Sequence, residues 1–289
     1  GSGESTSPSE SQVAQGEPAG DRPDGAGESG DSGEAAESGD GAQATPVATA
    51  DGVDWSGVAE QVSPSVVAIS VASATAGGSG SGVILDEQGH VVTNDHVVSG
   101  AEDIRVTIGD NRAYDATVVG TDPETDLAVL KIDQAPEDLQ PITVGDDKEL
   151  NIGDPVMAVG NPLGLSGTVT TGIVSALDRP VTTSSADEQE QQGSPFGPQQ
   201  QSGSTPVVTS AIQTSAAVNP GNSGGALVDA AGRLVGINSS IATLGGSEGQ
   251  SGSIGIGFAI PVDEAQWIAE QLIEDGTAQH AFLGVTPTD

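Results

Sequence analysis

Cysteine is absent from this 289-residue chain, and basic and aromatic residues are scarce. Without cysteine the chain has no disulfide framework, no thiol nucleophile and no zinc knuckle. Lysine and arginine number 7 against 42 aspartates and glutamates, which gives a formal net charge of −35. Such a field repels the phosphates of nucleic acids and anionic lipid headgroups, so both are discounted as partners. No stretch approaches the roughly 18 consecutive apolar residues that a membrane-spanning helix needs.

The first part of the chain is polar and acidic. Residues 1–50 hold ten acidic residues, a single basic residue (Arg22), and no Ile, Leu, Met, Phe, Tyr or Trp. Because this segment buries too little apolar surface to offset chain entropy, residues 1–52 are predicted to be a disordered acidic tail. The tail is either a spacer to a membrane anchor outside this chain or a segment that only aids solubility.

The acidity extends beyond the tail. The remaining residues include 32 acidic and 6 basic side chains, and lysine occurs only at Lys131 and Lys148. This composition resembles that of proteins from extreme halophiles, whose surface carboxylates hold water. The alternative is an acidic surface that merely keeps the protein soluble.

From Val66 onward the sequence reads as a succession of short strands. Runs rich in Val, Ile and Thr alternate with turns, and residues 86–89 and 229–232 have the composition of hairpin turns. The predicted strands are 66–71, 82–85, 91–93, 104–108, 117–119, 127–132, 155–159, 168–176, 225–228, 234–237 and 254–260. Short strands at this spacing are typical of an all-β barrel or sandwich. One helix follows, with apolar residues at 3.6-residue spacing between Asp263 at the N-cap position and Gly276 at its end.

The strongest local signal is the segment 219–225, which reads NPGNSGG. A serine between glycines can occupy a tight turn with its hydroxyl exposed, so Ser223 is a candidate nucleophile. The backbone N–H groups of Gly221 and Ser223, with Asn222 between them, would form an oxyanion hole. Taken alone, the segment also has a plain interpretation as a glycine-rich hairpin turn.

A base and a carboxylate precede this serine. His96 follows the predicted strand 91–93, where a cleft can open. Asp126 starts the apolar strand 127–132, and a carboxylate there needs a partner such as His96 Nδ1–H, unless it simply caps a turn. The order His96, Asp126, Ser223 on an all-β chain is that of the chymotrypsin-like double six-stranded β-barrel. In that arrangement Ser223 attacks, His96 is the general base, and Asp126 fixes the tautomer of His96.

Further motifs run in order through most of residues 58–286. They are GSGVI at 80–84, TNDHVV at 93–98, DPETDLAV at 122–129, GNPLG at 160–164, TGIVSA at 171–176, QT at 213–214, the serine segment, and GIGFAIP at 255–261. Together they resemble the HtrA/Deg family of trypsin-like serine proteases. Residues 282–285 (FLGV) resemble the segment with which such proteins enter a PDZ domain, and the resemblance implies such a domain outside this chain.

The predicted organisation follows from these segments. Residues 1–52 are the tail, 53–135 the first barrel with His96 and Asp126, and 136–150 an inter-barrel linker. Residues 151–262 are the second barrel with Ser223 and a long polar loop at 181–206. Residues 263–289 are a C-terminal helix and the start of the linker to the PDZ domain. The resemblance also implies homotrimers, with contacts near Trp55, and an extracytoplasmic location.

The resemblance further suggests where substrate binds. The residue six before the nucleophile, at the base of the S1 pocket in trypsin-like folds, is Ala217. Val218 and Ile241 would line the same pocket, and Asn238, Ser239 and Ser240 would pair with the substrate backbone. This pocket predicts small or medium aliphatic P1 side chains. The alternative is that Ala217 and Val218 are ordinary core residues.

The sequence therefore predicts a serine endopeptidase of extracytoplasmic protein quality control, which cleaves unfolded or damaged proteins through an acyl-enzyme. No motif calls for a metal or a cofactor, and none is predicted. Two alternatives stay open. One is a chaperone of the same fold that binds unfolded chains with little turnover, and the other is a secreted digestive protease.

Overall fold

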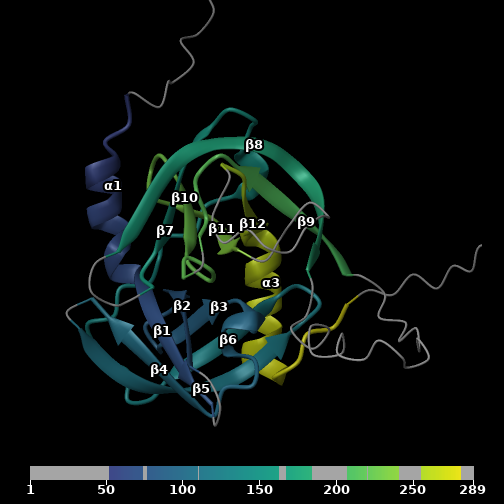
Figure 1. The fold of residues 1–289 in the computed structure, drawn as a ribbon. Coiled ribbons are helices and arrows are strands. Elements are labelled where there is room, and N and C mark those ends of the chain that lie inside the picture. The colour runs from purple at the N-terminus through teal and green to yellow at the C-terminus, as the bar shows by residue number, and fades with distance from the viewer. Residues whose placement is uncertain are drawn as a thin grey trace, which may run out of the picture. The chain divides into compact units, whose positions relative to one another are not determined.

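Twelve strands form two closed antiparallel barrels of six strands each in a computed structural model of the chain (Figure 1). The structure describes residues 52–73, 77–109, 111–162, 167–183, 207–219, 221–240 and 255–280. The predicted all-β double barrel with a C-terminal helix is confirmed. The predicted disordered tail lies outside the described residues except for Gly52. Residues 184–206 of the predicted polar loop also lie outside them.

The first barrel has the strand order β1-β2-β3-β6-β5-β4. Its strands are β1 (Val66–Ala72), β2 (Gly77–Ile84), β3 (His90–Thr93), β4 (Asp103–Ile108), β5 (Arg112–Asp122) and β6 (Leu127–Ile132). β-Branched and leucine side chains fill its interior; Ile69, Ile84 and Leu130 are completely buried. Such side chains suit a pleated surface that is buried on one face. The β2–β3 connection lies at the predicted hairpin turn 86–89.

The second barrel has the strand order β10-β11-β12-β9-β8-β7. Its strands are β7 (Pro155–Gly160), β8 (Thr168–Thr183), β9 (Val207–Thr214), β10 (Ala226–Asp229), β11 (Leu234–Ser239) and β12 (Gly257–Pro261). β9 was not among the predicted strands, although it closes the barrel by pairing with both β8 and β12. β8 also continues to Thr183, so the start of the predicted polar loop is strand.

Two longer helices pack on the barrels: α1 (Trp55–Val62), which the sequence did not predict, and α3 (Val262–Asp275). α3 begins after Pro261, so the prediction of Asp263 as its N-cap is wrong. Asp263 lies in the first turn, and its N–H donates to Asp147 Oδ1 at 2.9 Å. Gly276 ends the helix as predicted, in the left-handed conformation with φ of 73°.

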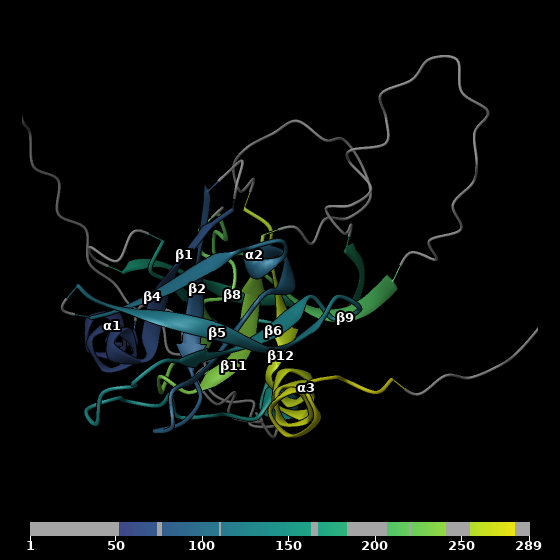
Figure 2. The ribbon, with the colours of Figure 1, turned by 90° about the horizontal axis from the view of Figure 1, so that it is seen from below.

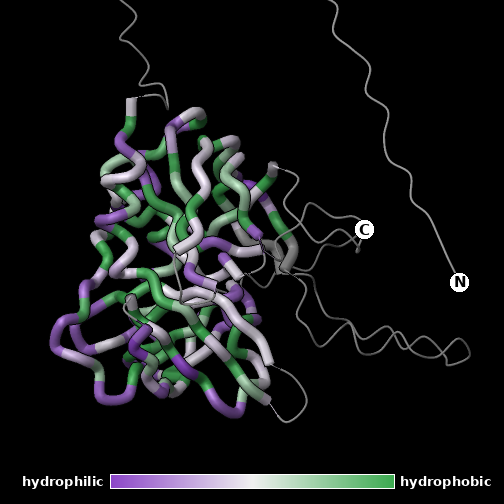
Figure 3. The backbone as a smooth tube through the Cα atoms, turned by 60° about the vertical axis from the view of Figure 1, so that its left-hand side comes forward, coloured by the Kyte–Doolittle hydropathy of each residue, from purple (hydrophilic) through white to green (hydrophobic). Residues whose placement is uncertain are grey.

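α3 contacts β5 and β6 of the first barrel and β11 and β12 of the second. Figure 2, in which α3 is seen end-on, shows it beside β6 and β12. Its buried side chains Ile268 and Leu272 join a core cluster that draws residues from both barrels. Figure 3 shows hydrophobic and hydrophilic stretches alternating along the backbone of the described residues. None of the helices in the described part of the chain has the length and apolar character needed to cross a membrane.

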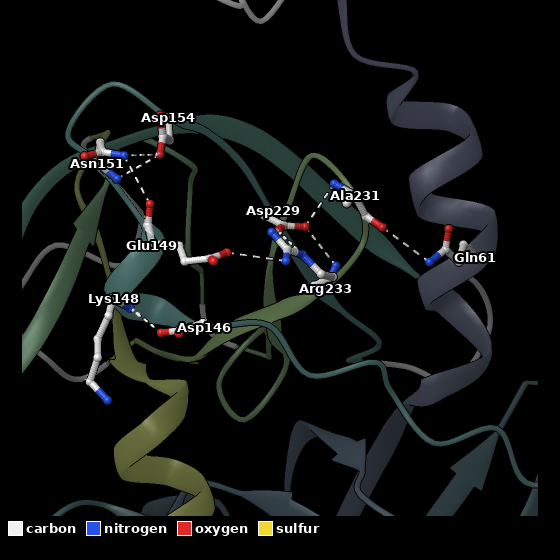
Figure 4. Close-up of polar contacts among 9 residues, drawn as sticks. All are labelled: Gln61, Asp146, Lys148, Glu149, Asn151, Asp154, Asp229, Ala231 and Arg233. Carbon is white, nitrogen blue, oxygen red and sulfur yellow. Dashed lines mark hydrogen bonds and ion pairs between the residues drawn. The ribbon is translucent and has the colours of Figure 1, made fainter.

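The segment between the barrels is fixed by hydrogen bonds and ion pairs (Figure 4). It carries the short 3₁₀ helix η3 (Asp147–Glu149), and a second such helix, η2 (Ser63–Ser65), follows α1. Asp229 Oδ1 accepts the N–H groups of Ala231 and Arg233, both at 2.9 Å, and so shapes the β10–β11 turn. The Arg233 guanidinium binds Asp229 Oδ2 at 2.7 Å and reaches Glu149 Oε2 at 3.5 Å. The inter-barrel segment is thereby held on the second barrel.

The charge of the folded part predicts that its stability depends on salt. Six basic side chains are too few to pair with the 32 acidic ones outside residues 1–50, so the surface repels itself. The Debye length falls from about 10 Å at 0.1 M salt to about 3 Å at 1 M. We expect the melting temperature, followed by circular dichroism, to rise markedly between 0.1 and 2 M NaCl. Sucrose, which is excluded from surfaces but does not screen charge, is the control. A melting temperature that stays flat across this range would contradict the expectation.

Candidate active site

Asp126 lies in the turn between β5 and β6, in a conformation that few non-glycine residues adopt. Its φ is 58°, and the residue is 4% exposed. Its carbonyl oxygen accepts hydrogen bonds from Asn94 Nδ2 at 2.9 Å and from Asp95 N–H at 3.1 Å. These bonds hold the strained residue against the segment that carries His96. The turn therefore presents the Asp126 carboxylate to the histidine.

His96 lies in the one-turn helix α2 (Asp95–Val98), directly after β3. Its Nδ1 is 2.9 Å from Asp126 Oδ1 and 3.0 Å from Oδ2, and its backbone N–H donates to Oδ1 at 3.1 Å. Ser239 Oγ adds a third donor to this carboxylate, at 3.2 Å from Oδ2. A carboxylate at Nδ1 favours the tautomer with the proton on Nδ1. His96 Nε2 is then left as an acceptor that can take a proton.

Ser223 lies at the N-terminal side of β10, in a loop built from two tight turns. Gly221 has φ of 96°, which favours glycine, and Asn222 N–H donates to Asn219 O at 2.9 Å. Gly224 has φ of 79°. Ser223 is 2% exposed, and its Oγ accepts the N–H of Ser240 at 3.1 Å and hydrogen-bonds the Ser240 hydroxyl.

The structure brings His96 and Asp126 together, whereas Ser223 points to another partner. Between the described residues His96 and Ser223 there is no hydrogen bond, because the serine hydroxyl is engaged with Ser240. The Ser223 hydroxyl must leave these contacts with Ser240 before it can donate to His96 Nε2.

The predicted oxyanion donors differ in how their N–H groups are used. Within the described part of the chain, the N–H groups of Asn222, Gly224 and Gly225 donate to Asn219 O, Asn238 O and Asn222 O. Those of Gly221 and Ser223 donate to no described partner. The N–H of Asn222 already donates to Asn219 O. The N–H groups of Gly221 and Ser223 are therefore the two predicted donors that can form hydrogen bonds to an oxyanion.

Two of the predicted S1 residues, Ala217 and Val218, lie in the segment that follows β9. Ala217 is half-buried, and its carbonyl accepts the Thr170 hydroxyl at 2.8 Å. Val218 is 6% exposed and belongs to the core cluster of the second barrel, which agrees with the alternative of a core role. Ile241 lies outside the described residues.

Residues 238–240, predicted to pair with the substrate backbone, also contact the candidate catalytic residues and the serine loop. Asn238 is fully buried, and its backbone exchanges hydrogen bonds with Gly224 and Gly225 in the serine loop. Ser239 donates to Asp126, and Ser240 holds Ser223. The sequence carries no signal for these side-chain contacts: Ser239 meets a residue of the other barrel, 113 positions away, and Ser240 meets Ser223 across a loop 17 positions away.

Asp95 adds a second carboxyl group beside His96 and Asp126. Burial raises the pKa of Asp95, and the Asp126 carboxylate raises this pKa further, while His96 and a hydrogen bond from Thr121 oppose the shift. Burial and the neighbouring Asp126 carboxylate thus favour the neutral form of Asp95 relative to a free aspartate.

Residues 80–237 match the family described as the trypsin-like peptidase domain. The structure of the HtrA-type protease AlgW with decapeptide is similar with a TM-score of 0.61 and 36% identity, over 78% of this chain and 69% of that one. This chain belongs to the HtrA-type family of trypsin-like serine proteases. The serine protease PepD of Mycobacterium tuberculosis is 47% identical over 243 residues, which is 80% of this chain and 49% of that protein.

Other HtrA-type relatives come from distant organisms. The chloroplastic Protease Do-like 1 of Arabidopsis thaliana is 44% identical over 208 residues, covering 72% of this chain and 42% of that protein. This HtrA-type chain thus spans about half the length, or less, of the curated relatives it matches. The range of organisms gives no support to a halophilic origin, and adaptation to salt stays a prediction.

Proposed function

We propose that this HtrA-type domain is a serine endopeptidase that uses His96, Asp126 and Ser223 as its triad. The observation that carries the proposal is that the Asp126 carboxylate, in a buried turn, forms hydrogen bonds with both the His96 Nδ1 and the His96 backbone N–H. Among the described residues, His96 Nε2 has no hydrogen-bond partner, and neither do the N–H groups of Gly221 and Ser223 in the serine loop. Cleavage of casein by the purified protein, and its loss on replacement of Ser223, tests the proposal.

The reaction follows from the roles of these atoms. Ser223 Oγ forms a bond to the scissile carbonyl carbon as its proton passes to His96 Nε2. The carbonyl oxygen becomes an oxyanion that accepts the N–H groups of Gly221 and Ser223. His96 then gives the proton to the leaving amine nitrogen, and the C–N bond breaks to leave an acyl-enzyme. Water, deprotonated by His96, hydrolyses that ester and restores the Ser223 hydroxyl.

The cellular role is inferred from the family. One relative is named as a probable periplasmic endoprotease and another as a chloroplastic protease. Both names support a location outside the cytoplasm for this chain. Resemblance to HtrA/Deg proteases supports unfolded or damaged proteins as substrates and assembly as homotrimers. Trp55, proposed to lie near the trimer contact, is half-buried against the core at the start of α1.

One observation favours the alternative of a chaperone with little turnover. Ser223 Oγ is held by Ser240 and not by His96, which is the arrangement of a resting nucleophile. A fluorophosphonate probe separates the two functions, because it labels only a serine that its base can activate. Stoichiometric labelling at Ser223 supports the protease, and binding of unfolded chains without labelling supports the chaperone.

Cleavage is expected after small or medium aliphatic residues. Ala217 lies at the position of the S1 base and offers no carboxylate, so a Lys or Arg side chain there would be a buried cation without a partner. Mass spectrometry of casein fragments should show most cuts after Val, Ala, Ile or Leu. A parallel digest with the Ser223→Ala protein is the control, and any cuts that it produces are assigned to contaminating proteases and subtracted. A majority of cuts after Lys, Arg or aromatic residues would refute this pocket.

A further inference from the structure

Ser81 of β2 makes four hydrogen bonds that together use its N–H, its carbonyl and its hydroxyl. Three of them go to residues outside β2 and the neighbouring strand β3. Its backbone N–H donates to Ser223 O at 2.8 Å, and its carbonyl accepts the Thr93 hydroxyl at 2.7 Å. Its own hydroxyl donates to Gly221 O at 2.7 Å and accepts the N–H of Asn161 at 2.8 Å. The residue is completely buried.

These contacts join the two barrels at the serine loop. Ser81 belongs to the first barrel, whereas Gly221 and Ser223 precede β10 and Asn161 follows β7 of the second. The packing there is close, since a Cβ added to Gly224 would lie 2.2 Å from Ser81 O and 2.3 Å from Thr93 Oγ1. A serine is small enough to fit and still has both a donor and an acceptor.

The Ser81 hydroxyl binds the peptide group that follows the one presenting the Gly221 N–H. The N–H of Gly221 and the carbonyl of Gly221 flank the same φ and ψ angles, and φ is held at 96°. Fixing the carbonyl by Ser81 Oγ restricts rotation at Gly221, and with it the direction of the Gly221 N–H. The bond from Asn161 N–H in turn fixes the direction of the Ser81 hydroxyl.

We propose that Ser81 is a positioning residue for the oxyanion hole, acting from the first barrel through the Gly221 carbonyl. The inference rests on the proposed function, because it takes Ser223 as the nucleophile and Gly221 N–H as an oxyanion donor. Ser81 touches neither the substrate nor the reacting atoms. Its effect is on the transition state, which needs the donor in place, and not on substrate affinity.

Ser81→Ala is the test, measured as kcat and KM on a peptide substrate. Loss of an oxyanion donor costs about 100- to 1,000-fold in kcat, and a donor that is only less well placed should cost about 10- to 100-fold, with KM within about threefold of the wild type. Affinity for a peptide boronic acid, which forms a tetrahedral adduct, should fall by a similar factor. Affinity for the same peptide with a reduced, uncleavable bond, which has no carbonyl oxygen, should be unchanged.

Thr93→Val is the matched control. This variant removes a buried hydroxyl that donates to the Ser81 carbonyl. The Thr93 hydroxyl, unlike that of Ser81, forms no hydrogen bond with Gly221 or Asn161. It should lower the melting temperature while leaving kcat and boronate affinity within about threefold of the wild type. If Ser81→Ala does not fold, Ser81→Cys keeps the size and a weak donor in a chain without other cysteines, and should show the same selective loss to a smaller extent.

Three results would overturn the proposal: unchanged kcat and boronate affinity in Ser81→Ala, equal losses for the boronate and the reduced peptide, or the same kinetic loss in Thr93→Val. These outcomes are separate from failure of the proposed function. That failure shows in the wild-type protein, as absent casein cleavage, or in Ser223→Ala, as retained cleavage.

Discussion

Replacement of Ser223 by alanine should abolish the cleavage of casein while the fold persists. Without the hydroxyl there is no nucleophile and no acyl-enzyme, and loss of one triad member removes roughly 10³- to 10⁶-fold of the rate. The expected measurement is release of casein fragments by the purified variant, compared with the wild type at equal concentration.

The fold of Ser223→Ala is checked by its melting temperature. The variant loses the contacts of the Ser223 hydroxyl with Ser240 N–H and Ser240 Oγ, which are worth about 1 kcal/mol each at most in net stability. A folded variant without cleavage supports the assignment of the nucleophile. Casein cleavage at the wild-type rate by a folded variant would refute it.

Asp126→Asn should lower kcat by about 10⁴-fold with little change in the backbone. The asparagine amide can accept the backbone N–H of His96, but it presents a donor or a weaker acceptor to His96 Nδ1. Since Asp126 is 4% exposed, no water replaces the lost charge at the imidazole. The histidine then loses both its fixed tautomer and the partner that stabilises its charged form. Steady-state kinetics on a peptide substrate measures the effect.

Asp122→Asn is a matched control in the same turn. Asp122 is also 4% exposed, and its carboxylate bonds the Thr125 hydroxyl and His280 Nε2, the latter at 2.9 Å. This variant should be destabilised but retain kcat within about fivefold of the wild type. If the two variants lost activity equally, the loss would reflect the turn as a whole and not the contact with His96.

The strands could be predicted largely because β-branched residues recur between turn residues, as in 66–71 and 127–132. β9 escaped prediction because the polar residues Ser210 and Gln213 interrupt its apolar run, although Pro206 directly precedes Val207 and marks a boundary. α1 escaped because it is only two turns long and includes Gly57, a poor helix former. The Asp54 carboxylate, which caps α1 by accepting Gly57 N–H at 3.1 Å, was the signal available in the sequence.

Candidates for the proposed site could be chosen from the sequence where one segment carries a recognisable pattern, as around His96, Asp126 and Ser223, and the structure brings the first two of them together. The contacts of Ser81, Ser239 and Ser240 were not predictable, because serine is common and its role depends on what the fold places nearby. Ser239 and its partner Asp126 are 113 positions apart in the chain. The N-cap at Asp263 was misassigned for a related reason, since Asp147 from the inter-barrel segment accepts the N–H of Asp263.

The packing of α3 on both barrels has a consequence for the order of events during synthesis. The helix contacts β5 and β6 as well as β11 and β12, yet it is made after all twelve strands. Domains fold as their chain emerges from the ribosome, and a core that lacks one of its elements is less stable. The shared core closes only once Asp275 has emerged, so the protease gains its full stability at the end of this part of its translation.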